Sequence, residues 1–430
     1  MAPRLRALRR LPARWRLHLV FWIASIAVGA TAVAFAQIAD KAGMLQRQWL
    51  SFSPWIFVLC APLGIGFLVW VTEKFYRQAS GSGIPQVIAA LQMPSSDKRR
   101  LALLAWPVAL VKIAMTSMGL LLGLSIGREG PTIQVGAAMM LASGKWARFP
   151  SRYLEKGLIL AGGAAGLAAA FNTPLAGIVF TIEELSHSFE EKINGLILTA
   201  VIFSGLIALA LMGNYYYFGQ VKATLPQSRD WFAIPLCGTC GGLLGGSFSA
   251  CLLWGNRRLK PFRQARPWLF GMGLGLLIAL LGLFSWGHTY GTGYIEAKIL
   301  LGHPDASIAT YAPTLWSPLL KILATLLSYF TGIPGGLFSP SLAAGTELGA
   351  ALARFFSSVP KEGIVLLGMA AYFTGVVQTP LTALVIIMEM THNNDMMLPL
   401  MITILLAQAA SRLICRKPLY QSLAEDFMRS

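Results

Sequence analysis

The chain of 430 residues is 55% hydrophobic and only 12% charged, whereas charged residues make up about a quarter of a typical soluble domain. This composition excludes an ordinary soluble globule. The formal net charge of +17 comes from 35 basic and 18 acidic residues, and the basic residues lie in short connections between apolar stretches. That distribution is typical of membrane topology and argues against a nucleic-acid-binding surface.

Apolar stretches of spanning length recur along the whole chain. They are residues 17–36, 55–70, 101–126, 195–212, 267–286 and 398–413. Because backbone in lipid must satisfy its own hydrogen bonds, they predict an all-α polytopic membrane protein. The 43 Gly and 23 Pro further predict helices that are interrupted within the membrane, which is typical of transporters.

The start of the chain predicts its orientation. Six arginines, with no acid among them, precede the first apolar stretch: Arg4, Arg6, Arg9, Arg10, Arg14 and Arg16. The positive-inside rule then predicts a cytoplasmic N-terminus, with the basic clusters at 257–266 and 412–417 on the same side. The alternative is a cleaved signal peptide, since Ala34-Phe35-Ala36 resembles a cleavage site, but the apolar run is long for one.

An internal repeat organises the chain. The segments 162–174 (GGAAGLAAAFNTP) and 368–380 (GMAAYFTGVVQTP) align at a shift of 206 residues, which also places Glu183 on Glu389. A weaker match at a shift of 209 places Gly127 and Pro131 on Gly336 and Pro340. The alignment predicts these parts: a basic N-terminus (1–16), a first membrane repeat (17–213), a connection (214–231), a second repeat (232–419) and a short C-terminus (420–430). The residues leave open whether the repeats are parallel or inverted.

Three segments run from glycine to proline: 81–85 (GSGIP), 127–131 (GREGP) and 332–340, which ends in GLFSP. Glycine permits unusual backbone angles and proline favours the first helical turn, so each segment predicts a helix N-terminus. Free N–H groups and the helix dipole make such an end an anion site without a basic side chain. The alternative is three loop turns at the membrane surface.

Two polar side chains within these segments indicate how an anion is handled. Ser82 offers a hydroxyl that can cap the helix or donate to an anion. Glu129 places a carboxylate where an anion would bind, so it predicts a gate that opens on protonation or on displacement by the substrate. The alternative for Glu129 is an ordinary helix-capping acid at the interface.

Three more positions carry chemistry near apolar segments. Glu183 and Glu184 end an apolar run, and only one of two adjacent helical residues is expected to face the interior. Lys112 lies within an apolar stretch and is a candidate partner for a buried acid, or it snorkels to the interface. Tyr420 follows the last span and, taken alone, reads as an interfacial anchor.

Signatures of enzymes and metal sites are weak. Cys237 and Cys240 form a single CxxC without a second pair or a nearby histidine, so no metal site is expected. No cofactor-binding or catalytic motif stands out. An intramembrane enzyme or scaffold that used Glu129 or Glu184 as a general acid or base remains an alternative, but no nucleophile–base pair supports it.

Taken in order, GSGIP, GREGP and GLFSP resemble the three anion-selectivity motifs of the CLC chloride channels and transporters. The resemblance spans nearly the whole chain. It implies a homodimer in the bilayer with one pore per subunit, two inverted halves of tilted and partial helices, and both termini in the cytoplasm, here of a bacterial inner membrane. Because the chain ends shortly after Tyr420, we expect a prokaryotic exchanger type without the cytoplasmic CBS domains.

The resemblance also implies roles for individual residues. The expected anion-binding residues are Ser82, Gly83, Ile84, Glu129, Gly130, Leu337, Phe338 and Tyr420. Glu129 and Glu184 are expected as the outer and inner proton-transfer groups, with Lys112 in support. The predicted function is exchange of chloride for protons, and the alternative is a passive, voltage- or proton-gated chloride channel. Close bacterial members of the family carry an acid at the position of Ile88, so this chain departs from the family pattern there. Nitrate-preferring members carry proline at the position of Ser82, so the serine favours chloride.

Overall fold

The computed structural model describes residues 13–94, 97–146, 152–186, 191–213, 216–225, 228–303, 311–356 and 360–429. Within these ranges every regular element is helical, and seven helices are long and apolar enough to cross a membrane. The prediction of an all-α polytopic protein is therefore confirmed. The predicted basic N-terminus lies outside the described residues, except for the backbone of 13–16 at the start of α2.

The first half of the chain runs from α2 to α10. Its elements are α2 (Ala13–Phe52), α3 (Ile56–Phe75), η1 (Arg77–Ala79), α4 (Ile84–Gln92), α5 (Arg99–Leu103), α6 (Trp106–Leu121), α7 (Glu129–Trp146), α8 (Arg152–Phe171), α9 (Pro174–Phe180), η2 (Thr181–Ser186) and α10 (Glu191–Met212). The apolar stretch 101–126 is thus split between α5 and α6. Pro107 explains the break, because proline is tolerated only in the first turn of a helix.

The second half runs from η3 to α19. Its elements are η3 (Ser228–Phe232), α11 (Ala233–Ala265), α12 (Pro267–Phe284), α13 (Tyr294–Leu300), α14 (Ser317–Phe330), α15 (Phe338–Leu352), η4 (Ala353–Phe355), α16 (Lys361–Val377), α17 (Pro380–Thr391), α18 (Met397–Ile414) and α19 (Leu419–Arg429). The three Gly-to-Pro segments lead into α4, α7 and α15. Their prediction as helix starts is confirmed.

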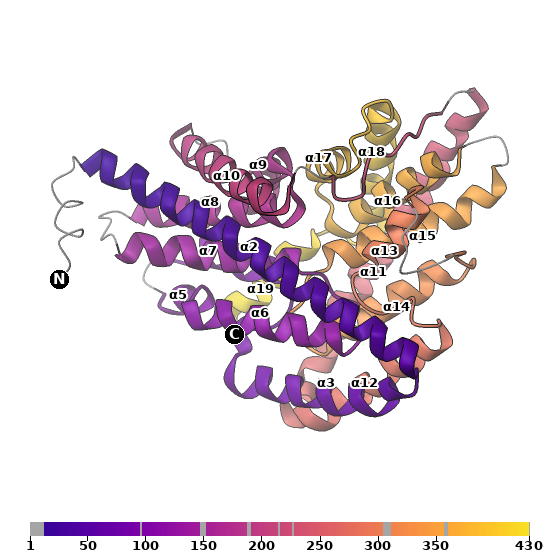
Figure 1. Ribbon diagram of the computed structural model, residues 1–430, viewed down its shortest axis with the longest axis horizontal. Coiled ribbons are helices and arrows are strands. Elements are labelled where there is room, and N and C mark those ends of the chain that lie inside the picture. Colours follow the sequence, from indigo (N-terminus) through magenta and orange to yellow (C-terminus); the bar gives the residue numbers. More distant parts are fainter. Residues whose placement is uncertain are drawn as a thin grey trace.

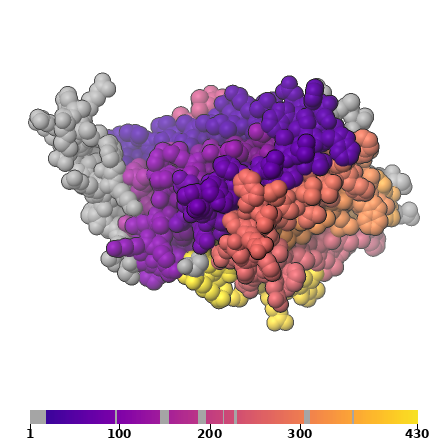
Figure 2. Space-filling model, turned by 90° about the horizontal axis from the view of Figure 1, so that it is seen from below, coloured from indigo at the N-terminus to yellow at the C-terminus, as the bar shows by residue number. Residues whose placement is uncertain are grey.

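The two halves share one packing scheme. In the first half α7 packs on α8 and α8 on α10, and in the second half α15 packs on α16 and α16 on α18. Two helices also pack against their own counterparts: α3 lies along α12, and α9 contacts α17 (Figure 1). From below, the indigo-to-purple surface of the first half meets the orange surface of the second (Figure 2). This is the architecture of two inverted repeats.

Paired glycines bring the inner helices of each half into close contact. A Cβ on Gly136 of α7 would collide with the backbone of Gly162 of α8, and the reverse also holds. In the second half Gly345 of α15 and Gly368 of α16 stand against each other's helix in the same way. Small residues at these crossings allow dense packing in lipid, where the hydrophobic effect does not drive helix association.

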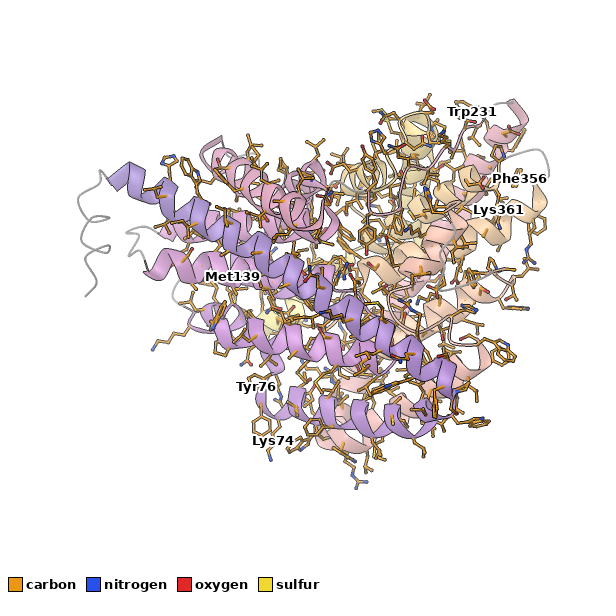
Figure 3. The ribbon with its side chains drawn as sticks, viewed as in Figure 1. Lys74, Tyr76, Met139, Trp231, Phe356 and Lys361 are labelled. Carbon is orange, nitrogen blue, oxygen red and sulfur yellow. The ribbon has the colours of Figure 1, made fainter. Side chains whose placement is uncertain are left out.

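Helices begin and end at two opposite faces of the molecule. Lys74 and Tyr76, at the end of α3, lie at the lower left of the view, and α2 begins at the upper left (Figure 3). Trp231, Phe356 and Lys361 lie on the right (Figure 3). The interrupted helices α4, α7 and α15 meet between these faces, where the site is built.

Candidate anion and proton site

The second and third motifs are joined directly at their glycines. The N–H of Gly127 donates to the carbonyl of Gly336 at 2.7 Å, and the N–H of Gly336 donates back to Gly127 at 2.7 Å. This is a two-residue antiparallel bridge between segments 209 positions apart. It holds the N-termini of α7 and α15 against each other, so that the positive ends of two helix dipoles meet.

The first motif joins the same junction. The N–H of Gly81 donates to Gly332 at 3.3 Å, and the N–H of Gly335 donates to Gly81 at 3.1 Å. Gly83 has a φ of +105°, and a side chain there would come within 2.7 Å of the carbonyl of Gly130. Glycine is required here because neither the backbone angle nor the space permits a Cβ.

Gly130 marks the point where all three motifs converge. A Cβ on this residue would collide with Ser82 Oγ and would lie 2.8 Å from the Ser82 carbonyl and 3.5 Å from the Gly336 Cα. The structure therefore brings together the predicted anion-binding residues of the first two motifs and sets the third beside them.

Glu129 occupies this junction as the first residue of α7 and is fully buried. One carboxylate oxygen, Oε1, accepts a hydrogen bond of 2.5 Å from the Ser339 hydroxyl. The other, Oε2, has no hydrogen-bond partner among the described residues and folds back over Gly127, where a Cβ would strike it. A buried carboxylate with one free oxygen at paired helix N-termini occupies an anion's place.

Two buried hydroxyl groups, those of Ser82 and Tyr420, lie near this junction. Ser82 and Tyr420 are 1% and 0% exposed, and neither hydroxyl oxygen has a hydrogen-bond partner among the described residues. Tyr420 lies in the first turn of α19, which packs on α4, and its ring centroid is 5.9 Å from that of Phe338. Buried, unpaired O–H donors are uncommon in native proteins, and here they suit an anion. Gly83, not Ser82, is the N-cap of α4.

Glu184 lies in η2, a single π-helical turn at the end of α9. It is 1% exposed, and neither carboxylate oxygen has a hydrogen-bond partner among the described residues. Its neighbour Glu183 points elsewhere and binds the backbone N–H groups of Leu381 and Thr382 at 3.1 and 2.7 Å. As predicted for adjacent helical residues, one acid of the pair faces the interior. π-helical turns are frequent at functional sites.

Aromatic rings from distant segments pack around Phe338, one of the predicted anion-binding residues. Phe180, four residues before Glu184, packs edge-on against Phe338 with centroids 5.9 Å apart. Phe171 stacks on the other side of Phe338 at 6.3 Å, and Tyr420 lies within electrostatic range of both Glu184 and Glu129. The sequence reading identified Phe338 and Tyr420 as candidates but missed Phe171 and Phe180. The available signal for Phe171 was its place inside the repeated segment 162–174.

Lys112 is fully buried and does not snorkel to the interface. Its Nζ donates to the carbonyl of Ala79 at 3.0 Å, and no ion pair involves it within the described ranges. The lysine thus fastens α6 to η1, directly before the first motif. Ile88, where the resemblance led us to expect an acid, is also fully buried.

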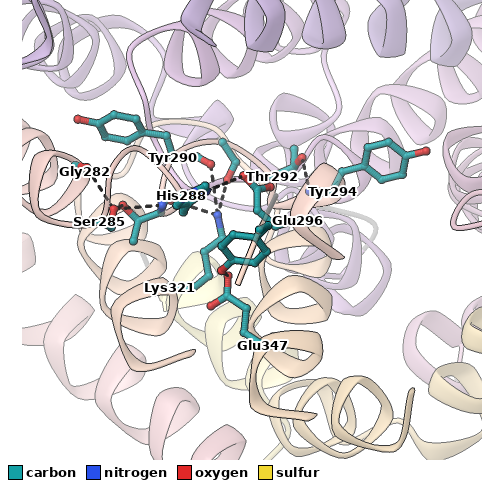
Figure 4. Close-up of polar contacts among 12 residues, drawn as sticks. Gly282, Ser285, His288, Tyr290, Thr292, Tyr294, Glu296, Lys321 and Glu347 are labelled. Carbon is teal, nitrogen blue, oxygen red and sulfur yellow. Dashed lines mark hydrogen bonds and ion pairs between the residues drawn. The ribbon is translucent and has the colours of Figure 1, made fainter. Parts of the chain in front are cut away.

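The second repeat contains a counterpart of this lysine that the sequence reading missed. Lys321 lies 209 positions after Lys112, and its Nζ donates to the carbonyls of Thr289, Tyr290 and Gly291 at 3.1, 3.4 and 3.0 Å (Figure 4). The shift that relates the motifs would have identified it. Around it lie Glu347, which accepts a hydrogen bond from Tyr311 at 2.8 Å, and Glu296, which is 3.7 Å from His288.

A cavity of about 290 Å³ reaches the first motif from the face that carries the end of α3. Ser80 and Gly81 are among its lining residues. Its cationic lining comes from Arg77, Arg99, Lys260 and Arg263, opposed by Glu73 and Asp426. Among these, Arg263 and Glu73 form a buried ion pair at 2.6 Å. The excess of cations is suited to attract a small anion.

A helical membrane protein with two inverted halves, whose interrupted helices point their N-termini at a buried carboxylate, belongs to the class of ion transporters and channels. Residues 64–412 match the family described as voltage gated chloride channel. The chain belongs to this family. No group of His, Cys, Asp or Glu side chains suited to a metal occurs among the residues that the structure describes.

The curated relatives and solved structures agree with this assignment. The chain is 32% identical to proteins named H(+)/Cl(-) exchange transporter ClcA from Salmonella paratyphi A and Salmonella arizonae, over 94% of this chain and 83% of theirs. A slow cyanobacterial Cl-/H+ antiporter has a similar fold, with a TM-score of 0.82 and 24% identity, covering 96% of this chain and 98% of its own. A CLC-type fluoride/proton antiporter aligns with a TM-score of 0.75 and 23% identity over 96% and 99%.

Proposed function

We propose that this protein is a secondary active transporter that exchanges chloride for protons, and not an enzyme. The observation that carries the proposal is Glu129, a fully buried carboxylate with one free oxygen at the junction of three helix N-terminal segments. Chloride and this carboxylate compete for one positive site. The ClcA relatives, which carry the exchanger name, support exchange.

The anion path uses the residues of the three motifs. Ser82 and Tyr420 donate their unpaired hydroxyls to a central chloride, and the backbone N–H groups of Gly83, Ile84, Gly130, Leu337 and Phe338 complete the sites. The cation-lined cavity next to Ser80 and Gly81 is the cytoplasmic entrance. Binding by hydroxyls and amides avoids a full positive charge and so allows rapid release.

The proton path diverges from the anion path on the cytoplasmic side. Glu184 takes the proton from inside and Glu129 exchanges it with the outside, while Lys112 supports the backbone before the first motif. A buried acid with no hydrogen-bond partner is costly in a membrane, and such acids mark ion or proton pathways. Glu184 supports exchange over a passive channel, since a channel needs no inner proton group.

We further propose the organisation of the assembly. The first repeat spans 17–213, the connection 214–231 and the second repeat 232–419, flanked by 1–16 and 420–430, with both ends in the cytoplasm of a bacterial inner membrane. Large apolar side chains are exposed on α10, α12 and α18, which supports contact with lipid and with a second subunit in a homodimer. Chemical crosslinking in membranes tests the dimer.

Purified protein in liposomes tests the proposed function directly. With chloride and proton fluxes recorded together, an imposed chloride gradient drives protons uphill in the opposite direction if the protein is an exchanger. Chloride movement without protons would identify the passive channel. Liposomes that keep their chloride gradient, although the protein is folded and inserted, would overturn the transport function itself.

A further inference from the structure

The gating carboxylate is held by a side chain of the opposite repeat. Ser339, the second residue of α15, is 4% exposed and donates its hydroxyl to Glu129 Oε1 at 2.5 Å. The bond links residues 210 positions apart. It runs beside the Gly127–Gly336 bridge, which fixes the two backbones on which Glu129 and Ser339 stand.

A second hydroxyl lies near the first. Tyr217, in the connection between the repeats, is 4% exposed, and its phenol lies within interaction range of Ser339. Phe171 and Tyr294 hold the phenol ring edge-on at centroid distances of 5.3 and 4.8 Å.

We propose that Ser339 is a latch that holds the Glu129 carboxylate in the anion site and thereby sets how readily chloride displaces it. Ser339 is a positioning residue, because it acts through Glu129. The inference deepens the proposed function by naming the group that regulates the gate.

The Ser339 hydroxyl should stabilise the closed gate, so the direction of the effect of removing it can be predicted. A hydrogen bond from a neutral hydroxyl to a carboxylate is stronger than one between neutral groups, and it favours the ionised, inward form of the acid. Removing the hydroxyl weakens the closed gate relative to both the protonated gate and the chloride-filled site. Chloride then competes more effectively with the carboxylate for the site.

Within the described part of the chain, the other titratable groups near Glu129 make no hydrogen bond to its carboxylate. Arg128, the preceding residue, directs its guanidinium to Asp40 of α2 at 2.5 Å and to the Ala36 carbonyl. Tyr217 and Tyr420 lie within electrostatic range of Glu129 from the connection and from α19. Among the described residues, Ser339 provides the hydrogen bond to the carboxylate itself.

The test compares Ser339→Ala with Ser339→Thr, which keeps a hydroxyl, and with Ser341→Ala. Ser341 lies two residues further along α15, is 1% exposed, and has a hydroxyl without a partner in the described structure. The Ser341 variant therefore removes a buried hydroxyl of the same helix without touching Glu129.

Calorimetry on the purified protein in detergent measures chloride binding directly. Ser339→Ala should bind chloride about tenfold more tightly. Ser339→Thr and Ser341→Ala should match the wild type. An unchanged chloride affinity in Ser339→Ala, or an equal change in Ser341→Ala, would overturn the latch.

A double-variant comparison separates the latch from a general effect on the fold. When Glu129 is already Gln, Ser339→Ala should leave chloride binding within twofold, because the ionised acceptor is gone. A tenfold change in both backgrounds would overturn the latch. Chloride binding in detergent does not depend on transport, so tighter binding by Ser339→Ala in a protein that moves no chloride would refute the proposed function and leave the latch intact.

Discussion

Glu183 and Glu389 cap each other's helices. Glu183, after α9, accepts the N–H groups of Leu381 and Thr382 at the start of α17, and Glu389, near the end of α17, accepts those of Leu175 and Ala176 at the start of α9 at 3.1 and 2.7 Å. The two helices are therefore antiparallel and related by a local two-fold axis. Each acid satisfies N–H groups that would otherwise lack a partner.

Because each acid caps the other's helix, we expect Glu183 and Glu389 to contribute equally to stability. We expect only Glu183 to affect proton coupling. Glu183→Ala and Glu389→Ala should each lower stability by about 1–2 kcal/mol, because each removes the acceptor at a helix N-terminus. Thermal unfolding in detergent measures this loss. Only Glu183→Ala should also lower the number of protons moved per chloride, since Glu184 follows it in η2. Loss of coupling of the same size in Glu389→Ala would contradict this division.

Glu184→Gln should stop proton movement while chloride flux continues. The amide keeps the size of the side chain but cannot be ionised, and the proposed chloride contacts, those of Ser82 and Tyr420, lie elsewhere. Paired flux recording in liposomes measures both ions. Glu183→Gln is the matched control, because an amide oxygen can still accept one of the bonds from α17. Full proton coupling in Glu184→Gln would remove this residue from the mechanism.

Glu129→Gln should uncouple the ions by a different route. Without a carboxylate the site is no longer blocked by an anion of the protein itself, so chloride should move with little dependence on external pH. The rate of chloride efflux measured across a range of external pH tests this. A pH dependence as steep as that of the wild type would place the gate at another residue.

Gly130→Ala should abolish chloride transport with little loss of expression. The added methyl group would strike the Ser82 hydroxyl and backbone at the convergence of the three motifs, and forced contacts of this kind typically cost about 1–3 kcal/mol. Gly273→Ala on α12 is the control, because no atom lies within 4 Å of the added Cβ. Chloride efflux from liposomes at normal rates in Gly130→Ala would show that the motifs can separate without loss of function.

The sequence by itself determined the class of fold and most of the candidate site. The length of the apolar stretches specifies helices, since lipid leaves backbone no other partner. The Gly-to-Pro spacing located the starts of α4, α7 and α15, because the backbone preferences of glycine and proline are local. The repeat aligned Glu183 with Glu389, and the resemblance of the three motifs identified the positions of Glu129, Glu184 and Tyr420 as candidate functional groups.

Only the tertiary structure decided what these residues touch. The bond from Ser339 to Glu129 joins the two repeats, and the mutual capping by Glu183 and Glu389 depends on the repeats being inverted, which a linear alignment cannot distinguish from parallel ones. Lys112 is another example. Its charge suggested an acidic partner, but in the folded protein its Nζ donates to the backbone carbonyl of Ala79. Which residues meet across a two-fold axis depends on packing between distant segments, and local sequence preferences do not specify that packing.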